Sequence, residues 1–540
     1  MMTLSNCATA QQSSGDLLAP VYAKREATSA SSAKNWAEAE KKWEQATALN
    51  PTDANGWLEL GRARYYGKKY LEAVEPMQKA NDLGVSYAWD MPYFQACCYA
   101  LGGKPQEAMD KLREAVNAGF RDLRFIPTDD DLKSLRDLPE FKELTDTDDV
   151  TKLDRTQGIV HDIRFYQREL KRLDYRERNY KDTGLDAYAD QFAKDVPNLT
   201  DNQVMVHFMR MGAMMGDGHT GIYPPHPGMD GLPIAFTSFE EGMYITAALP
   251  EQKDLLGAKL ISIDGHSVDD VMKAIGTIMG RENDQWLKSR GPHFLRKPRC
   301  LNGLGLSPTD KQVTLKIEKD GKTSDVTLNG NYGEMGEGWA TLAESFKDRP
   351  LIFQNRDKHF WYKYLPESKT VYFVYNGVAN EEKQTIADFA KELFAFVDSH
   401  DVDRMVVDTR FNGGGNNFLN MPLVLGLAES KVNKPGHLFV IIGRDTFSAA
   451  QCFVTQVERY TKAIFAGEPT GSAPNFIGES IPVNLRYVKM QGSISDLYWQ
   501  NSVAMDHRIW ISPEIYVPTT FAAYAANRDP VFEAVMAYKS

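Results

Sequence analysis

The sequence predicts a multidomain α+β protein with N-terminal helical-hairpin repeats, a helical bundle, a β module and a C-terminal core of alternating strands and helices. Alanines recur about every 34 residues, at Ala39, Ala73 and Ala108, which is typical of helical repeats. Apolar and polar residues alternate as in strands through residues 230–330. Strand, helix and strand patterns then follow one another in residues 336–540. At 540 residues the chain is long enough for several separate cores.

Residues 1–34 predict a flexible leader, because they are rich in Ser, Ala, Thr and Gln and show little apolar periodicity. Within them, Cys7–Ala10 before Gln11 resembles the small-residue end of a signal peptide. The charged and apolar regions that normally precede such an end are missing.

Residues 35–148 predict about three helical hairpins followed by a capping and linking segment. In each repeat a second small residue follows the first, and a large residue lies between them, so that paired helices can approach closely. The second small residues are Ala46, Ala80 and Ala115, and the large ones are Trp43, Met77 and Leu112. Together with Pro51, Trp57 and Gly61, this pattern resembles tetratricopeptide repeats. Stacked hairpins expose a concave face, which favours a docking surface for a protein partner over a folding appendage.

Residues 149–229 predict a helical bundle. The apolar positions of its first helix keep a helical spacing and are Ile159, Ile163, Tyr166 and Leu170. The segment Asn198–Asp201 offers an N-cap for the last helix. The bundle ends at Asp217–Thr220, and we expect it to deliver His219 to the cleft of the core.

Residues 230–335 predict a β module that resembles a PDZ domain. Its strand-like segments surround one helical segment and comprise residues 243–247, 257–265 and 313–317. The insertion Arg281–Leu306 is longer than such modules usually carry. Two interpretations stay open: a substrate tail adds to the sheet as an edge strand, or the module is a purely structural insert.

The C-terminal core, residues 336–540, combines a glycine run and a serine that suit acyl-transfer chemistry. An apolar strand at Met405–Val407 leads to Gly413–Gly415, where main-chain N–H groups can face a ligand closely. A second apolar strand, Leu438–Ile442, ends shortly before Ser448, and a helical pattern begins directly after this serine. Ser448 is therefore expected near a helix N-terminus, where free N–H groups and the helix dipole can hold an oxyanion.

Three motifs follow one another in this core. They read Asp408-x-Arg410-x-Asn412-Gly413-Gly414, Thr446-Phe447-Ser448-Ala449-Ala450-Gln451 and Gly467-Glu468-Pro469-Thr470-Gly471. In this order they resemble the signatures of the C-terminal-processing (tail-specific) and tricorn-like serine peptidases. The resemblance implies a crotonase-like or Clp-like ββα core with Ser448 as nucleophile. It also implies an oxyanion hole, for which the main-chain N–H groups of Gly413 or Gly414 and of Ala449 are the candidates.

A missing lysine distinguishes between the branches of this family. Tail-specific members pair the serine with a lysine about 25 positions later, but Gly471–Asn475 of this chain contains none. Tricorn-like members use a histidine from an upstream segment, and Met215–Thr220 resembles the turn that carries it. The resemblance therefore implies that His219 is the general base that takes the proton from Ser448.

The acidic member of the site has several candidates. A glutamate before the late strand takes part in tricorn-like sites, and Asp506 is the nearest carboxylate in the corresponding region of this chain. Glu468 and Asp217 are rivals for this role. The serine that precedes the histidine in tricorn-like sites is replaced here by Gly218, so this part of the relay is absent.

Charge and composition argue against several other functions. A formal net charge of −11 and a pI near 5.5 argue against a nucleic-acid partner. No apolar run approaches about 18 residues, so the sequence predicts no membrane span. The five cysteines lack metal-ligand spacing, and Gly413–Gly415 lacks the Gly-Lys-Ser/Thr ending of a nucleotide site. The sequence therefore implies no cofactor and no metal.

The sequence thus predicts an exported serine peptidase of the tricorn-like type, which cleaves peptides or unfolded protein tails through an acyl-enzyme. Export to the periplasm or beyond rests on the resemblance, because most bacterial relatives act outside the cytoplasm. The alternative is a catalytically inactive peptide- or partner-binding protein on a peptidase scaffold, favoured by the missing lysine and relay serine. A hydrolase of non-peptide esters is a third hypothesis.

Overall fold

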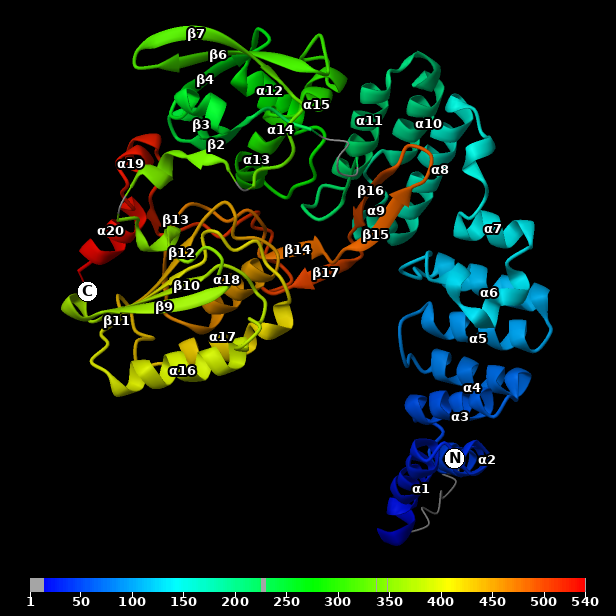
Figure 1. The fold of residues 1–540 in the computed structure, drawn as a ribbon. Coiled ribbons are helices and arrows are strands. Elements are labelled where there is room, and N and C mark those ends of the chain that lie inside the picture. The colour runs from blue at the N-terminus through cyan, green and yellow to red at the C-terminus, as the bar shows by residue number, and fades with distance from the viewer. Residues whose placement is uncertain (1–13, 225–229, 337, 347, 540) are drawn as a thin grey trace, which may run out of the picture. The chain divides into compact units, whose positions relative to one another are not determined.

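The computed structural model describes residues 14–224, 230–336, 338–346 and 348–539 (Figure 1). The chain forms two compact units, one ending at Lys152 and the other beginning at Leu153. The expected combination of N-terminal helical repeats with a mixed helix and sheet remainder is confirmed. Within the described ranges, no helix has both the length and the apolar character needed to cross a membrane.

The first unit consists of antiparallel helical hairpins that stack on one another (Figure 1). The repeat alanines Ala39, Ala73 and Ala108 are fully buried, which explains why a small residue stands at each of these positions. The helices are α1 Ser14–Ser32, α2 Trp36–Leu49, α3 Ala54–Tyr66, α4 Tyr70–Asp82, α5 Asp90–Leu101, α6 Pro105–Asn117 and α7 Pro139–Thr145.

The prediction of a flexible leader is wrong for residues 14–32, which form helix α1. Residues 1–13, with the segment that resembles a signal-peptide end, lie outside the described residues. Ala27 and Ala30 stand one helical turn apart and pack in one cluster with Trp43 of α2. Alanine has the highest helix propensity of all residues, so an alanine-rich segment that suggests disorder by composition forms a helix when it has a partner.

The second unit begins with a helical bundle that ends in the turn carrying His219. Its helices are α8 Arg155–Leu173, α9 Tyr175–Tyr180, α10 Leu185–Asp195 and α11 Asp201–Ala213. Strand β1 (Gly221–Tyr223) follows this turn and pairs antiparallel with β16 (Met490–Ile494), which pairs with β15 (Ile481–Leu485). The C-terminal segment therefore returns to the bundle (Figure 1) and holds the turn in place.

The β module of this unit is an antiparallel sheet in the order β2-β3-β4-β6-β7. Its elements are β2 Ile234–Phe239, β3 Gly242–Ala248, β4 Lys259–Ile263, β5 His266–Ser267, α12 Val268–Ile275, β6 Gln312–Lys319, β7 Lys322–Asn329 and β8 Ala340–Thr341. The predicted insertion, Arg281–Leu306, forms three short helices, α13 Asp284–Arg290, α14 Pro292–Leu295 and α15 Pro298–Gly303. Helix α13 packs Trp286 against Phe447 of the core. The PDZ-like interpretation of the sheet stays a prediction.

The core sheet has the order β18-β13-β12-β11-β10-β9, and all neighbouring strands are parallel except β9 and β10. The strands are β9 Phe360–Leu365, β10 Thr370–Tyr375, β11 Arg404–Asp408, β12 Leu438–Ile442, β13 Ile464–Gly467 and β18 Ile515–Tyr516. The accompanying elements are α16 Ile386–Ser399, α17 Met421–Glu429, α18 Ala449–Tyr460, β14 Asn475–Gly478, β17 Leu497–Gln500, α19 Phe521–Ala525 and α20 Pro530–Ala537. The carboxyl ends of adjacent parallel strands share one edge, so the glycine run after β11 and the serine turn after β12 meet there.

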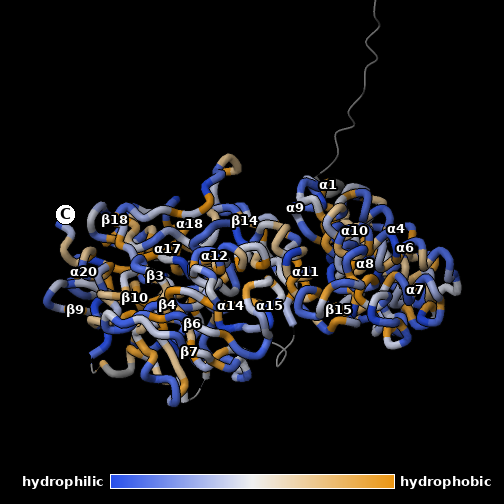
Figure 2. The backbone as a smooth tube through the Cα atoms, turned by 90° about the horizontal axis from the view of Figure 1, so that it is seen from above, coloured by the Kyte–Doolittle hydropathy of each residue, from blue (hydrophilic) through white to orange (hydrophobic). Residues whose placement is uncertain are grey.

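The end of β11 is fixed by buried charges. Strands β10 to β12 are buried on both faces, as parallel strands between two layers are, and Figure 2 shows hydrophobic, orange segments inside this unit. The carboxylate of Asp408 is fully buried and accepts hydrogen bonds from the Tyr372 hydroxyl (2.6 Å) and the Arg410 Nε (3.1 Å). Arg410 also donates to Asp529 at 2.8 and 2.7 Å. Because an unpaired buried charge is costly, this network holds the turn that follows the strand.

Candidate active site

Ser448 lies in a strained turn between β12 and α18. Its φ of +53° and ψ of −125° are unusual for any residue with a side chain, and such a conformation costs about 1–3 kcal/mol. The surrounding turn holds it there: Phe447 N–H donates to the carbonyl of Asn412 (3.1 Å), and the Thr446 hydroxyl donates to the carbonyl of Thr409 (3.0 Å). The strand, sharp turn and helix present the serine hydroxyl at the sheet edge, as nucleophile turns do.

The turn after the bundle brings His219 to this serine. His219 Nε2 lies 3.0 Å from Ser448 Oγ, although 229 positions separate the two residues in the chain. The Asp217 Oδ1 organises the turn by accepting hydrogen bonds from the main-chain N–H groups of His219 (2.8 Å) and Thr220 (2.7 Å) and from the Ser495 hydroxyl (3.0 Å). A base within hydrogen-bond reach of a hydroxyl is the arrangement that activates a nucleophile.

Aromatic rings enclose the imidazole of His219. Phe447 and Phe476 stack on it, with ring centroids 4.6 and 5.6 Å away. Burial lowers the pKa of His219 below its ordinary value, while the charge of Asp217 and the main chain of Ile477 act in the opposite direction. The imidazole is therefore neutral near pH 7 and ready to accept a proton.

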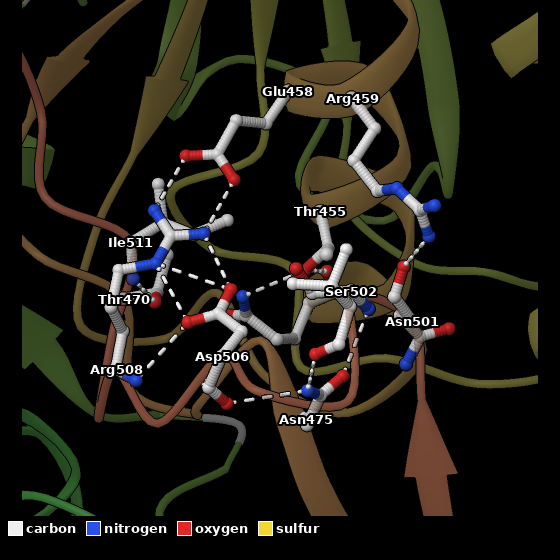
Figure 3. A network of polar contacts seen from close by, with 12 residues as sticks. Thr455, Glu458, Arg459, Thr470, Asn475, Asn501, Ser502, Asp506, Arg508 and Ile511 are labelled. Carbon is white, nitrogen blue, oxygen red and sulfur yellow. Dashed lines mark hydrogen bonds and ion pairs between the residues drawn. The ribbon is translucent and has the colours of Figure 1, made fainter.

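Asp506 does not contact His219. Its carboxylate accepts hydrogen bonds from Arg508 Nε (3.0 Å) and Nη2 (2.8 Å), and Arg508 also pairs with Glu458 (Figure 3). These bonds hold the pKa of Asp506 far below its usual range. The sequence position suggested an acidic partner for the histidine, but the nearby Arg508 binds this carboxylate instead.

The two rivals of Asp506 also have other partners. Glu468 pairs with Arg444 at 2.7 Å and accepts a hydrogen bond from the Thr519 hydroxyl at 2.7 Å. Asp217 contacts the main chain of the histidine turn and not the ring. Among the described residues, no carboxylate bonds to a ring nitrogen of His219, and the main chain of Ile477 is the polar group besides Ser448 that interacts with the ring. The structure thus supports the imidazole through its turn, its stacked rings and the main chain of Ile477.

A carboxylate that the sequence analysis did not single out lies beneath the same turn. Glu282 Oε1 accepts a hydrogen bond from the main-chain N–H of Gly218 at 3.1 Å, and its carboxylate also interacts with the Ser472 side chain. Burial, and secondly the charge of Asp217, raises the pKa of Glu282 to about 8. Glu282 stands in the predicted insertion, where no pattern of spacing distinguishes it from a surface glutamate.

Steric packing explains why a glycine, Gly218, precedes His219. A Cβ on Gly218 would lie 2.6 Å from the Phe447 ring, so the ring that stacks on His219 occupies the space of the relay serine.

The glycine run supplies main-chain donors beside Ser448. Gly414 has a φ of +108°, and a Cβ there would lie 2.7 Å from the Cβ of Ser448 and 2.9 Å from the amide nitrogen of Ala449. The Gly414 N–H already donates to the Asn412 side chain (2.9 Å). Among the described residues, the N–H groups of Gly413 and Ala449 have no acceptor. These two N–H groups are therefore the donors left for a developing oxyanion.

Known proteins resemble this chain in one segment of the sequence and in the fold. A family model for the N-terminal domain of A/B-hydrolase-like proteins matches residues 58–154, and no curated sequence matches the chain. The structure of mature CPAF complexed with lactacystin is similar at 14% identity and a TM-score of 0.50, covering 71% of this chain and 98% of that chain. A second structure of mature CPAF gives 14% identity, 70% and 96% coverage, and a TM-score of 0.50. The chain has the fold of mature CPAF.

This shared fold confirms, at the level of the fold, the expected resemblance to the tail-specific peptidases, a family that includes CPAF. The photosystem II D1 C-terminal processing protease is a more distant match, with 13% identity over 67% of this chain and 93% of that chain and a TM-score of 0.35.

The two glycines give a matched test of this geometry. Replacing Gly414 with alanine places a methyl group against Ser448 and Ala449, so we expect the rate at which a fluorophosphonate labels Ser448 to fall at least ~100-fold, as it does when an oxyanion donor is lost. The same methyl group on Gly413 meets nothing closer than the Arg290 Nη2 at 3.7 Å, so Gly413→Ala should change the rate less than about fivefold, since its N–H is kept. Equal losses in the two variants would contradict this assignment.

Proposed function

We propose that the protein is a serine endopeptidase that hydrolyses peptide bonds through an acyl-enzyme, with a Ser/His arrangement in place of Ser/Lys. The 3.0 Å contact between His219 Nε2 and Ser448 Oγ carries this proposal. The two main-chain N–H groups without acceptors beside the serine support it, and so does the fold shared with mature CPAF. Among the described residues, no lysine Nζ contacts the Ser448 hydroxyl.

The first half of the reaction forms the acyl-enzyme. His219 takes the proton of the Ser448 hydroxyl while its oxygen attacks the substrate carbonyl carbon, and the carbonyl oxygen becomes an oxyanion. The N–H groups of Gly413 and Ala449 stabilise this oxyanion. The tetrahedral intermediate then expels the amine, which receives the proton from His219, and an ester to Ser448 remains.

The second half reverses these roles with water. His219 takes a proton from the water molecule as its oxygen attacks the ester carbonyl, and then returns a proton to Ser448 as the ester bond breaks. In each half the imidazole becomes positively charged, and the nearby charge of Asp217 stabilises that form. Glu282 supports the turn through its hydrogen bond to Gly218, and Asp506 has no role in the proposed reaction.

The finer assignment of the domains belongs to the same proposal. Residues 336–540 would be a crotonase/Clp-like catalytic core, residues 230–335 a PDZ-like module, and residues 35–148 tetratricopeptide-like repeats that dock a protein partner. Residues 149–229 would be the bundle that supports His219. Peptides or unfolded protein tails would be the substrates, and the protein would act after export.

Labelling with a fluorophosphonate, read by intact mass, tests the proposed function. The wild type should gain one adduct as the Ser448 oxygen bonds to phosphorus, fluoride leaves and His219 takes the proton. Ser448→Ala should gain none, and His219→Ala should react at least ~1000-fold more slowly, because the serine then lacks its base. His266→Ala, which alters an exposed histidine of the β module, should react like the wild type.

Cleavage of unfolded casein by the same four proteins then tests the peptidase assignment. Labelling together with casein fragments supports a peptidase. Labelling without fragments would favour an esterase, and a folded wild type without an adduct would favour the catalytically inactive binding protein.

The pH dependence of labelling tests the electrostatics of the base. Only neutral His219 can accept the proton, so the rate should fall on the acid side with the pKa of this residue. Burial lowers that pKa, which places the acid limb below the ordinary histidine value of about 6.5. In Asp217→Asn the raising effect of the carboxylate is lost, so the limb should move to still lower pH. A limb that stays in place or moves to higher pH would contradict the assigned effect of Asp217.

A further inference from the structure

Four flat groups contact one another in series: the imidazole of His219, the rings of Phe447 and Trp286, and the guanidinium of Arg290. Helix α13 carries Trp286 and Arg290 one helical turn apart, so both project from the same face. Trp286 stacks on Phe447 with ring centroids 3.9 Å apart and an angle of 9° between the rings. The Arg290 guanidinium lies over the Trp286 ring, 4.6 Å from its centroid. Since Phe447 also stacks on His219, the position of Arg290 is tied to the catalytic histidine.

The guanidinium of Arg290 lies beside the glycine run. Its Nη2 is 3.7 Å from the point where a Cβ on Gly413 would stand. The only carboxylate that pairs with it within the described ranges is that of Asp445, at 3.7 Å, and the same oxygen of Asp445 also accepts a hydrogen bond from the Ser289 hydroxyl. Arg290 makes no hydrogen bond to any described residue, and half of its side chain is exposed. Its N–H donors make no hydrogen bond within the described ranges and can therefore bind a ligand.

A cavity of about 510 Å³ opens between this arginine and the histidine turn. Its walls are mostly apolar and include Tyr223, Phe236, Met279, Trp286, Phe294 and Met335, and Gly218 of the histidine turn also lines it. Two arginines, Arg290 and Arg296, and one carboxylate, Glu334, also line it. Arg296 is already bound by the carbonyls of Leu232 and Gly333 and by Glu334, which leaves Arg290 as the lining cation able to bind a ligand.

We propose that Arg290 is a specificity-determining residue that binds a carboxylate of the substrate close to the scissile bond. This inference rests on the proposed function and names the substrate class for it: peptides with a negative charge within a few residues of the cleaved bond. An acidic side chain and the C-terminal carboxylate of a peptide offer the same chemistry. The planar guanidinium matches a carboxylate with two parallel hydrogen bonds, and its stacking on Trp286 holds it in the orientation for binding.

Three fluorophosphonate probes of equal length test this proposal. One ends in a free carboxylate, one bears an aspartyl side chain and an amidated end, and one is neutral with an asparaginyl side chain and an amidated end. We expect at least one charged probe to label the wild type roughly three- to tenfold faster than the neutral probe, because the site is half exposed and water weakens the ion pair. Preference for the first indicates a peptide terminus, and preference for the second indicates an acidic side chain.

Three variants test whether the preference for a charged probe depends on Arg290. In each variant the rate with a charged probe is divided by the rate with the neutral probe. Arg290→Gln should lower this ratio to about one, and its labelling by the neutral probe shows that Ser448 still reacts. Arg290→Lys should keep only part of the preference, because lysine keeps the charge but not the forked geometry. Lys273→Gln removes one exposed positive charge from α12 of the same module and should keep the full preference.

The outcomes separate this proposal from the function on which it rests. Equal rates for all three probes in the wild type, or a preference that survives in Arg290→Gln, would overturn the role of Arg290 and leave Ser448 an active nucleophile. A wild type that reacts with none of the probes would overturn the proposed function and the role of Arg290 with it.

Discussion

The contact between His219 and Ser448 is the constraint on which the rest of the site depends. The two residues come from different parts of the second unit, and their atoms must stay within about 3 Å for proton transfer. Each is held by its own scaffold: the serine by a strained turn at the edge of the core sheet, and the histidine by a turn at the end of a helical bundle. The energy needed to hold both is supplied by the packing of these scaffolds and not by the contact itself.

Three features of the structure fix the contact between His219 and Ser448. The buried charges of Asp408, Arg410 and Asp529 hold the glycine run at the sheet edge. The pairing of β1 with β16 anchors the histidine turn from the C-terminal side. Stacked aromatic rings then set the plane of the imidazole. The site is therefore assembled from segments that fold together, and none of them carries its chemistry alone.

Local patterns predicted the parts of the site that are local. The strand that ends at Asp408, the glycine run and the helix after Ser448 depend on residues close in sequence, so their order could be recognised. Pairing between segments far apart in the sequence could not be recognised, because nothing in the sequence links Gly221–Tyr223 with Met490–Ile494. The role assigned to Asp506 failed for the same reason, since a position before a late strand does not reveal that Arg508 captures the carboxylate. Glu282 carried no signal, because a lone glutamate in an insertion resembles a surface residue.

A crystal structure of the protein after reaction with diisopropyl fluorophosphate tests the central claim most directly. The account predicts phosphorus bonded to Ser448 Oγ, with the phosphoryl oxygen within about 3.1 Å of the main-chain nitrogens of both Gly413 and Ala449. His219 should remain within hydrogen-bond distance of the adduct. A phosphoryl oxygen that points away from these two nitrogens, or an adduct on another residue, would contradict it.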